Sequence, residues 1–136
     1  MSSTKRIPSA ELGARGERRA CWYYRLRGYR ILEKNYHTGG GEIDLVVRRG
    51  STLAFVEVKT RQTLTAGEGY ESVDARKRAQ IVRLAERYLS ARRDTPRFVR
   101  YDVLSLYWNG NRFEVRHFPD AFRPVSDPDR PWRWRV

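Results

Sequence analysis

The sequence predicts a single mixed domain of the α/β or α+β class. The predicted elements follow the order helix, three strands, helix, two strands, and we find no internal repeat. The chain has 136 residues, of which 40% are hydrophobic and 12% aromatic, so one well-packed core is feasible at this length. The two central apolar runs are almost continuous apart from their ionisable residues. Such runs are typical of a sheet that is covered on both faces.

The first half of the domain is expected to contain one helix and three strands. Apolar and small residues recur at helical spacing up to Arg27, with Ser9 as a plausible N-cap and Gly28 as a plausible stop. Three runs rich in β-branched and aliphatic residues then predict strands. The strands are expected over residues 29–35, 42–48 and 52–60, with a hairpin between the last two.

The second half is expected to contain one long helix and two more strands. Residues 61–71 carry two glycines and no periodicity, which predicts a loop. Ser72 is expected to cap a helix that runs to about Arg93 with an apolar stripe along one side. Strands follow over 97–108 and 112–118, and the Asn-Gly dipeptide between them is a strong hairpin signal.

These elements divide the chain into three parts. Residues 1–9 are expected to form a flexible N-terminal tail, and residues 10–118 the folded domain. Residues 119–136 contain four prolines and several arginines, which predicts an extended basic C-terminal tail.

The charge balance favours a polyanionic partner. Lys and Arg number 28 against 16 Asp and Glu, a net charge of +12, and only four of the 28 are lysines. Arginine presents a planar fork that suits bidentate contact with phosphate. We therefore expect a nucleic acid, with DNA favoured, as the partner.

Several other classes are excluded or disfavoured. No run of 18 apolar residues is present, so no transmembrane helix is expected, and Met1–Ser9 lacks the apolar region of a signal peptide. Cys21 is the single cysteine, which excludes an internal disulfide or a multi-cysteine zinc site. His37 and His117 have no ligand spacing and are expected at the surface or at strand ends. We expect a cytoplasmic protein that does not bind membranes.

Three ionisable residues interrupt the central strands and form the candidate site. Glu57 and Lys59 are two positions apart and therefore lie on one face of their strand. A hairpin loop of two or four residues places Asp44 on that face too, directly or diagonally opposite Glu57, and directly opposed β-carbons are about 4.5–5.5 Å apart. Two such carboxylates repel each other unless a cation lies between them. A hard divalent metal with the Val58 carbonyl as a third ligand fits this arrangement, and a buried structural ion-pair cluster is the alternative.

The same residues carry a resemblance to a known family. Gly41–Leu45 (GEIDL), followed by Phe55–Arg61 (FVEVKTR), resembles the YraN family of uncharacterised bacterial proteins. That family is similar to archaeal Holliday-junction resolvases of the restriction-endonuclease-like PD-(D/E)xK superfamily. The resemblance implies a central mixed sheet of about five strands flanked by helices. One departure from the superfamily pattern is Ile43, which stands where many members have proline.

The resemblance also implies roles for individual residues. Asp44 and Glu57 would bind Mg²⁺ or Mn²⁺, and Lys59 would be the catalytic lysine that positions or activates the attacking water. Glu17 on the first helix matches the additional acidic residue that such resolvases contribute to the metal and catalytic site. A solvated helix face is the alternative for Glu17.

A basic surface near the second helix is the candidate DNA contact. Its residues lie mostly outside the apolar stripe, although a merely solvated face would show the same pattern. The expected nucleic-acid-binding residues are Arg61, Arg76, Lys77, Arg78, Gln80 and Arg83.

The leading functional hypothesis is a metal-dependent endonuclease-like hydrolase that cleaves phosphodiester bonds in DNA, with branched or junction DNA among its candidate substrates. The small size of the chain suggests that a homodimer or a partner completes target recognition. The first alternative is a non-catalytic nucleic-acid-binding module that retains the nuclease fold. A weaker alternative is a subunit whose basic face docks an acidic protein.

Overall fold

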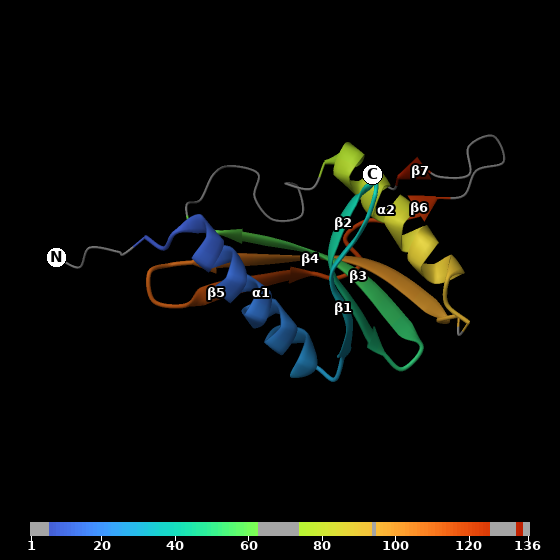
Figure 1. The fold of residues 1–136 in the computed structure, drawn as a ribbon. Helices are drawn as coiled ribbons and strands as arrows, with labels where there is room; N and C mark the ends of the chain where they lie inside the picture. Colours follow the sequence, from blue (N-terminus) through green and yellow to red (C-terminus); the bar gives the residue numbers. More distant parts are fainter. Residues whose placement is uncertain (1–5, 63–73, 94, 126–132, 135–136) are drawn as a thin grey trace.

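The structure is a computed structural model that describes residues 6–62, 74–93, 95–125 and 133–134. Two helices and a five-stranded sheet form the body of this described part, and two short strands pair beside it (Figure 1). The elements are α1 (Ser9–Arg25), β1 (Arg30–Thr38), β2 (Gly41–Arg49), β3 (Thr52–Arg61), α2 (Ala75–Ser90), β4 (Phe98–Trp108), β5 (Phe113–Phe118), β6 (Pro124–Val125) and β7 (Arg133–Trp134).

The large sheet is mixed, with the strand order β1-β2-β3-β4-β5. Three of its neighbouring pairs are antiparallel, and β3 and β4 run parallel. Parallel neighbours need a long crossover, and here the connection that contains α2 provides it. The predicted α/β domain, with a mixed sheet of about five strands flanked by helices, is confirmed.

The two helices cover opposite faces of this sheet. Along β3, Leu53 and Phe55 pack in a cluster with residues of α2, whereas Ala54 and Val56 pack with residues of α1. The alternation explains why the apolar runs are almost continuous, because both faces of the strand are buried. Figure 1 shows α1 and α2 separated by the sheet. No helix in the described ranges is long and apolar enough to cross a bilayer.

The helix α1 starts and stops close to the expected positions. Ser9 is its first helical residue and Pro8 its N-cap, so the expectation that Ser9 is the N-cap is wrong by one residue. The Pro8 carbonyl accepts the first helical hydrogen bond, from the Leu12 N–H at 2.9 Å. The helix ends at Arg25, two residues early, and the chain turns at Gly28, whose φ of +87° favours glycine.

The helix α2 begins later than expected. Ser72, the expected cap, lies outside the described residues, and Asp74 is the N-cap, its side chain accepting a hydrogen bond from the Lys77 N–H at 2.9 Å. An aspartate at this position satisfies a free helical N–H as well as a serine does. The helix ends at Ser90 rather than near Arg93.

Segments at both ends of the expected domain also pack against it. Ile7 is buried, and its backbone N–H and carbonyl bond the Gln62 side chain at 2.9 and 2.6 Å. Near the other end, Phe122 is buried and its ring lies over that of Tyr101, with 5.3 Å between the centroids. The packed body therefore includes residues just outside 10–118.

A buried carboxylate in β4 joins the ends of α1 and β5 to the sheet. Asp102 is fully buried and accepts hydrogen bonds from the Tyr24 hydroxyl at 3.0 Å and from the Arg100 guanidinium at 2.8 and 3.1 Å. His117 Nε2 lies 2.9 Å from the same carboxylate, and the Asp120 N–H donates at 3.0 Å. His117 lies near the end of β5, as one of the two expectations had it, and it is also part of this buried network.

The network favours the charged form of Asp102. Burial alone would raise its pKa, but the hydrogen bonds from His117, Arg100 and the Asp120 N–H together outweigh burial and lower the pKa to about 2. The unfolded chain, with the ordinary value of 3.8, binds more protons between these two values. Stability therefore falls as the pH drops from about 4 toward 2.

Asp102→Asn is expected to lower the free energy of unfolding at neutral pH by about 3 kcal/mol, because Arg100 keeps its charge without its buried partner. It should also make the free energy of unfolding depend less on pH between about 4 and 2, because the titrating carboxyl group is removed. Urea unfolding at several pH values measures both effects, with Glu11→Gln on the exposed start of α1 as the control. Equal stabilities for the two variants would contradict the role assigned to the network.

Candidate functional site

The hairpin of β2 and β3 brings the expected acidic residues to one place. Arg49 pairs with Thr52, which leaves a two-residue turn in which Gly50 has a φ of +59°. The register continues to Leu45 opposite Val56, and one more step along it aligns Asp44 with Glu57. The register expected from the loop length is thus the one observed.

Backbone pairing between β2 and β3 stops at Asp44. Beyond the Leu45–Val56 pair, the Oδ2 of Asp44 accepts a hydrogen bond from the Val58 N–H at 2.7 Å. The side chain of Asp44 therefore replaces a backbone partner. Since the N–H and C=O of one strand residue point to the same side, the Val58 carbonyl also faces β2 at this point.

All of the expected catalytic and metal-binding residues line one open cavity of about 430 Å³. It is bounded by β2, β3, the start of α1 and one residue of β1. Its lining residues are Gly13, Glu17, Asn35, Asp44, Glu57, Val58, Lys59 and Thr60. Lys59 is exposed, whereas Asp44, Glu57 and Glu17 are half-buried, so the cavity has a charged rim and a more enclosed acidic interior.

The two carboxyl groups at the centre of the cavity perturb each other. Burial, followed by the negative charge of Asp44, raises the pKa of Glu57 to about 8. Burial also raises the pKa of Asp44, against the lowering effect of the Val58 N–H. One proton is therefore shared by the pair near neutral pH in the absence of a cation.

Two further contacts define the environment of Glu57. The Lys77 Nζ of α2 lies 3.8 Å from its Oε1 and lowers its pKa in part. The other oxygen, Oε2, is buried and has no hydrogen-bond partner among the described residues. A buried oxygen without a partner is costly in a folded protein, so this atom is positioned to take a ligand.

Glu17 reaches the cavity from α1 through a close helix–strand contact. A β-carbon at Gly16 would lie 2.5 Å from the Thr60 Oγ1, so only glycine allows this approach to β3. The Oε1 of Glu17 accepts a hydrogen bond from the Asn35 side chain at 2.6 Å. In the described part of the chain, no three His, Cys, Asp or Glu side chains are close enough to hold a metal together. Glu17 thus lines the same cavity but stands apart from the central pair.

The expected nucleic-acid-binding residues fall into two groups. Arg76 and Arg83 are exposed on α2, as the prediction requires. The others make contacts within the protein. Arg61 donates to the Ser105 hydroxyl at 3.2 Å, Arg78 lies 5.8 Å from the ring centroid of Phe122, Gln80 donates to the Gly40 carbonyl at 2.6 Å, and Lys77 contacts Glu57.

Two features near the cavity were not expected from the sequence, one contact and one backbone conformation. Gln80 holds the turn between β1 and β2, and a β-carbon at Gly41 would collide with it at 2.4 Å. Asn35 adopts a φ of +51° inside β1, a conformation that asparagine tolerates better than most residues. An asparagine followed by an aromatic residue in a strand is too common to have indicated this irregularity.

In the cation-free protein, the carboxyl group of Glu57 is expected to titrate near pH 8, measured by NMR of its side-chain carbon. Asp44→Asn should lower that pKa, because the neighbouring negative charge is removed. The control variant Glu114→Gln, on the opposite edge strand β5, should leave the titration unchanged. A Glu57 that titrates near its ordinary 4.5 in the wild-type protein would contradict the close pairing.

Comparison with known proteins places the chain in a family. The model of uncharacterised protein family UPF0102 matches residues 16–106. A UPF0102 protein of Syntrophotalea carbinolica is 44% identical over 111 residues, covering 82% of this chain and 90% of that protein. A UPF0102 protein of Geobacter metallireducens is 40% identical over 116 residues, covering 85% and 95%.

Among solved structures, Pyrococcus furiosus SfsA in complex with Ca²⁺ is similar at 16% identity and a TM-score of 0.36. The match covers 81% of this chain and 63% of that one. The family resemblance inferred from the GEIDL and FVEVKTR motifs is confirmed, and the chain belongs to the uncharacterised protein family UPF0102, the YraN family.

Proposed function

We propose that this protein is a metal-dependent, endonuclease-like enzyme of the cytoplasm that hydrolyses phosphodiester bonds in DNA. One observation carries the proposal. Asp44 and Glu57 face each other in an open cavity that Lys59 also lines. Acidic groups forced together beside a lysine, in a chain of net charge +12, combine cation binding with attraction for a polyanion.

The residues present fit a divalent cation. The buried Oε2 of Glu57 has no partner in the described structure, and burial and the charge of Asp44 raise the pKa of Glu57 although Lys77 and Lys59 offset part of the effect. Asp44, Glu57 and the Val58 carbonyl would hold Mg²⁺ or Mn²⁺, with Glu17 facing the same cavity. When bound, the metal polarises a phosphoryl oxygen as a Lewis acid.

The chain's own residues have separate tasks in this proposal. The Val58 N–H holds the Asp44 carboxylate in one orientation through the bond of 2.7 Å. Lys59, exposed on the face of β3 that also carries Glu57, is placed to orient the attacking water or to stabilise charge on the phosphoryl oxygens. Lys77 contacts Glu57 from α2 and balances part of its charge.

The surroundings of the cavity suit a nucleic-acid substrate. The helix α2 packs on the face of the sheet from which Glu57 meets Lys77. Arg76 and Arg83 are exposed on the same helix, and guanidinium groups bind phosphates bidentately. A DNA backbone contacting these arginines would pass close to the acidic pair.

The wild-type chain is expected to cleave DNA in the presence of Mg²⁺ or Mn²⁺. Asp44→Asn and Lys59→Ala should each reduce the cleavage rate about 100- to 1,000-fold, because each variant removes an electrostatic contribution to the transition state. The measurement is the cleavage rate of single-stranded, duplex and junction DNA. Glu114→Gln, which changes an exposed carboxylate on β5, is the matched control and should cleave like the wild type.

The outcomes separate the two main hypotheses. If Asp44→Asn cleaves as fast as the wild type, the activity comes from another source and the site assignment fails. If the wild type binds DNA but does not cleave it with either metal, the protein is a binding module that retains a nuclease-like site.

A further inference from the structure

A second cavity of about 420 Å³ adjoins the candidate active site along the seam between α1 and β1. The two cavities share Glu17. A third hollow of about 320 Å³ continues the seam and shares Arg25 and Lys34 with the second. Three adjoining hollows therefore form a track that leads away from the Asp44–Glu57 pair, along a helix on one side and an edge strand on the other.

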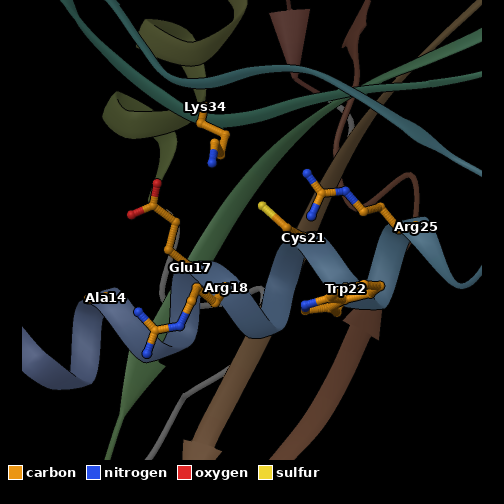
Figure 2. Close-up of a pocket in the computed structure, with 7 residues that line it drawn as sticks. All are labelled: Ala14, Glu17, Arg18, Cys21, Trp22, Arg25 and Lys34. Carbon is orange, nitrogen blue, oxygen red and sulfur yellow. The ribbon is translucent and has the colours of Figure 1, made fainter.

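Most of the charged residues that line the second cavity are cationic. Arg18 and Arg25 come from α1 and Lys34 from β1, against the single carboxylate of Glu17, which already accepts a hydrogen bond from Asn35. In Figure 2, Lys34 points from β1 across the gap toward α1, and Glu17 and the Arg25 guanidinium lie on the facing side. This charge distribution suits a ligand with negative groups at intervals along its length.

An exposed tryptophan lies between the two arginines. Arg18, Trp22 and Arg25 occupy positions i, i+4 and i+7 of α1, so they form one stripe along the helix. Trp22 is 56% exposed, although tryptophan is highly buried on average. The Arg25 guanidinium lies 5.7 Å from its ring centroid. An accessible aromatic ring flanked by cations matches the way proteins bind single-stranded nucleic acids, by base stacking with phosphate contacts.

We propose that this seam, defined by Glu17, Arg18, Trp22, Arg25 and Lys34, binds an unpaired DNA strand that continues from the cleavage site. A base stacks on Trp22, and the phosphates contact the arginines and Lys34. The strand is unpaired because bases inside a duplex are already stacked on both faces. The inference rests on the proposed function in one respect only, which is that the bound strand is the one that is cut.

The length of the seam is suitable for such a strand. Eight positions separate Glu17 from Arg25, about 12 Å along an α-helix. At about 3.4 Å per nucleotide of a stacked strand, this distance corresponds to roughly three or four nucleotides. The substrate class is therefore DNA with a single-stranded segment next to the scissile bond, such as a flap, an overhang or the open centre of a branch.

A second copy of the chain is a less suitable occupant for this surface. Trp22 and the 74%-exposed Leu26 would offer some apolar area. Arg18 and Arg25 flank the ring, however, and a symmetric contact through it would bring the arginines of two copies together. Like charges in an interface are costly, so the cationic flanks favour a polyanion.

The test measures DNA binding without divalent cations, so that no cleavage is required. Fluorescence anisotropy compares a fluorescein-labelled oligothymidylate with a blunt duplex. Trp22→Ala should weaken binding of the single strand about 10- to 100-fold, the usual effect of losing one stacked base, and change duplex binding less than about twofold. Trp22→Phe, which keeps an aromatic face, should restore most of the affinity, and the retained duplex binding of Trp22→Ala shows that this variant folds.

Phe98→Ala is the matched control, because Phe98 is 59% exposed on β4 and lies outside the seam. It should bind the single strand like the wild type. Equal single-strand affinity for Trp22→Ala and the wild type overturns the inference. A change from dimer to monomer in Trp22→Ala, with DNA binding unaltered, also overturns it and assigns the surface to self-association.

The failure of the proposed function would look different. If no variant and no wild-type protein cleaves DNA but single-strand binding depends on Trp22, the nuclease proposal fails and the binding site stands. If DNA is cleaved equally fast with and without a single-stranded segment, and the rate does not depend on Trp22, the nuclease proposal stands and the single-strand binding site fails.

Discussion

The mutual repulsion of two carboxyl groups is the constraint on which the candidate site depends. The two-residue turn at Gly50 sets the register of β2 and β3, and one step beyond the last pair of that register, Leu45 with Val56, Asp44 and Glu57 line the same cavity. Both groups are half-buried, so their negative charges are poorly screened. Retaining a proton or binding a cation relieves this repulsion, and burial, followed by the charge of Asp44, raises the pKa of Glu57 to about 8.

The rest of the fold supports this pair from both faces of the sheet. On one face, Gly16 lets α1 approach Thr60 closely, and this contact brings Glu17 to the cavity. On the other face, α2 brings Lys77 to Glu57. The Asp102 network joins α1 to β4 and β5, so the wall that carries Glu17 is held to the sheet at its far end.

The local features of this architecture could be predicted from the sequence. Alternation along 52–60 and the glycine turn before it were sufficient to place Glu57 and Lys59 on one face and Asp44 opposite. Continuous apolar runs correctly indicated a sheet covered on both sides. The helix start was misplaced at Ser72 because serine and aspartate are both good caps, and the choice between them depends on packing that a sequence does not display.

The features that could not be predicted all depend on residues far apart in the chain. His117 and Tyr24 meet at Asp102 although 93 positions separate them in the sequence. The spacing of apolar residues does not predict a contact of this kind. Gln80, for which the sequence predicts a DNA contact, donates a hydrogen bond to the Gly40 carbonyl across 40 positions. The contact of Lys77 with Glu57 likewise requires the crossover of α2 to be in place. Residue spacing predicts which side chains face each other within a hairpin, but it does not predict contacts between helices and strands that are far apart in the chain.

The most direct test of the central claim is anomalous diffraction from crystals soaked in Mn²⁺. The account predicts a single manganese peak in contact with the carboxylates of Asp44 and Glu57 and with the Val58 carbonyl, and no such peak in crystals of Asp44→Asn. Crystals that take up manganese elsewhere while the two carboxyl groups stay paired and cation-free would contradict it.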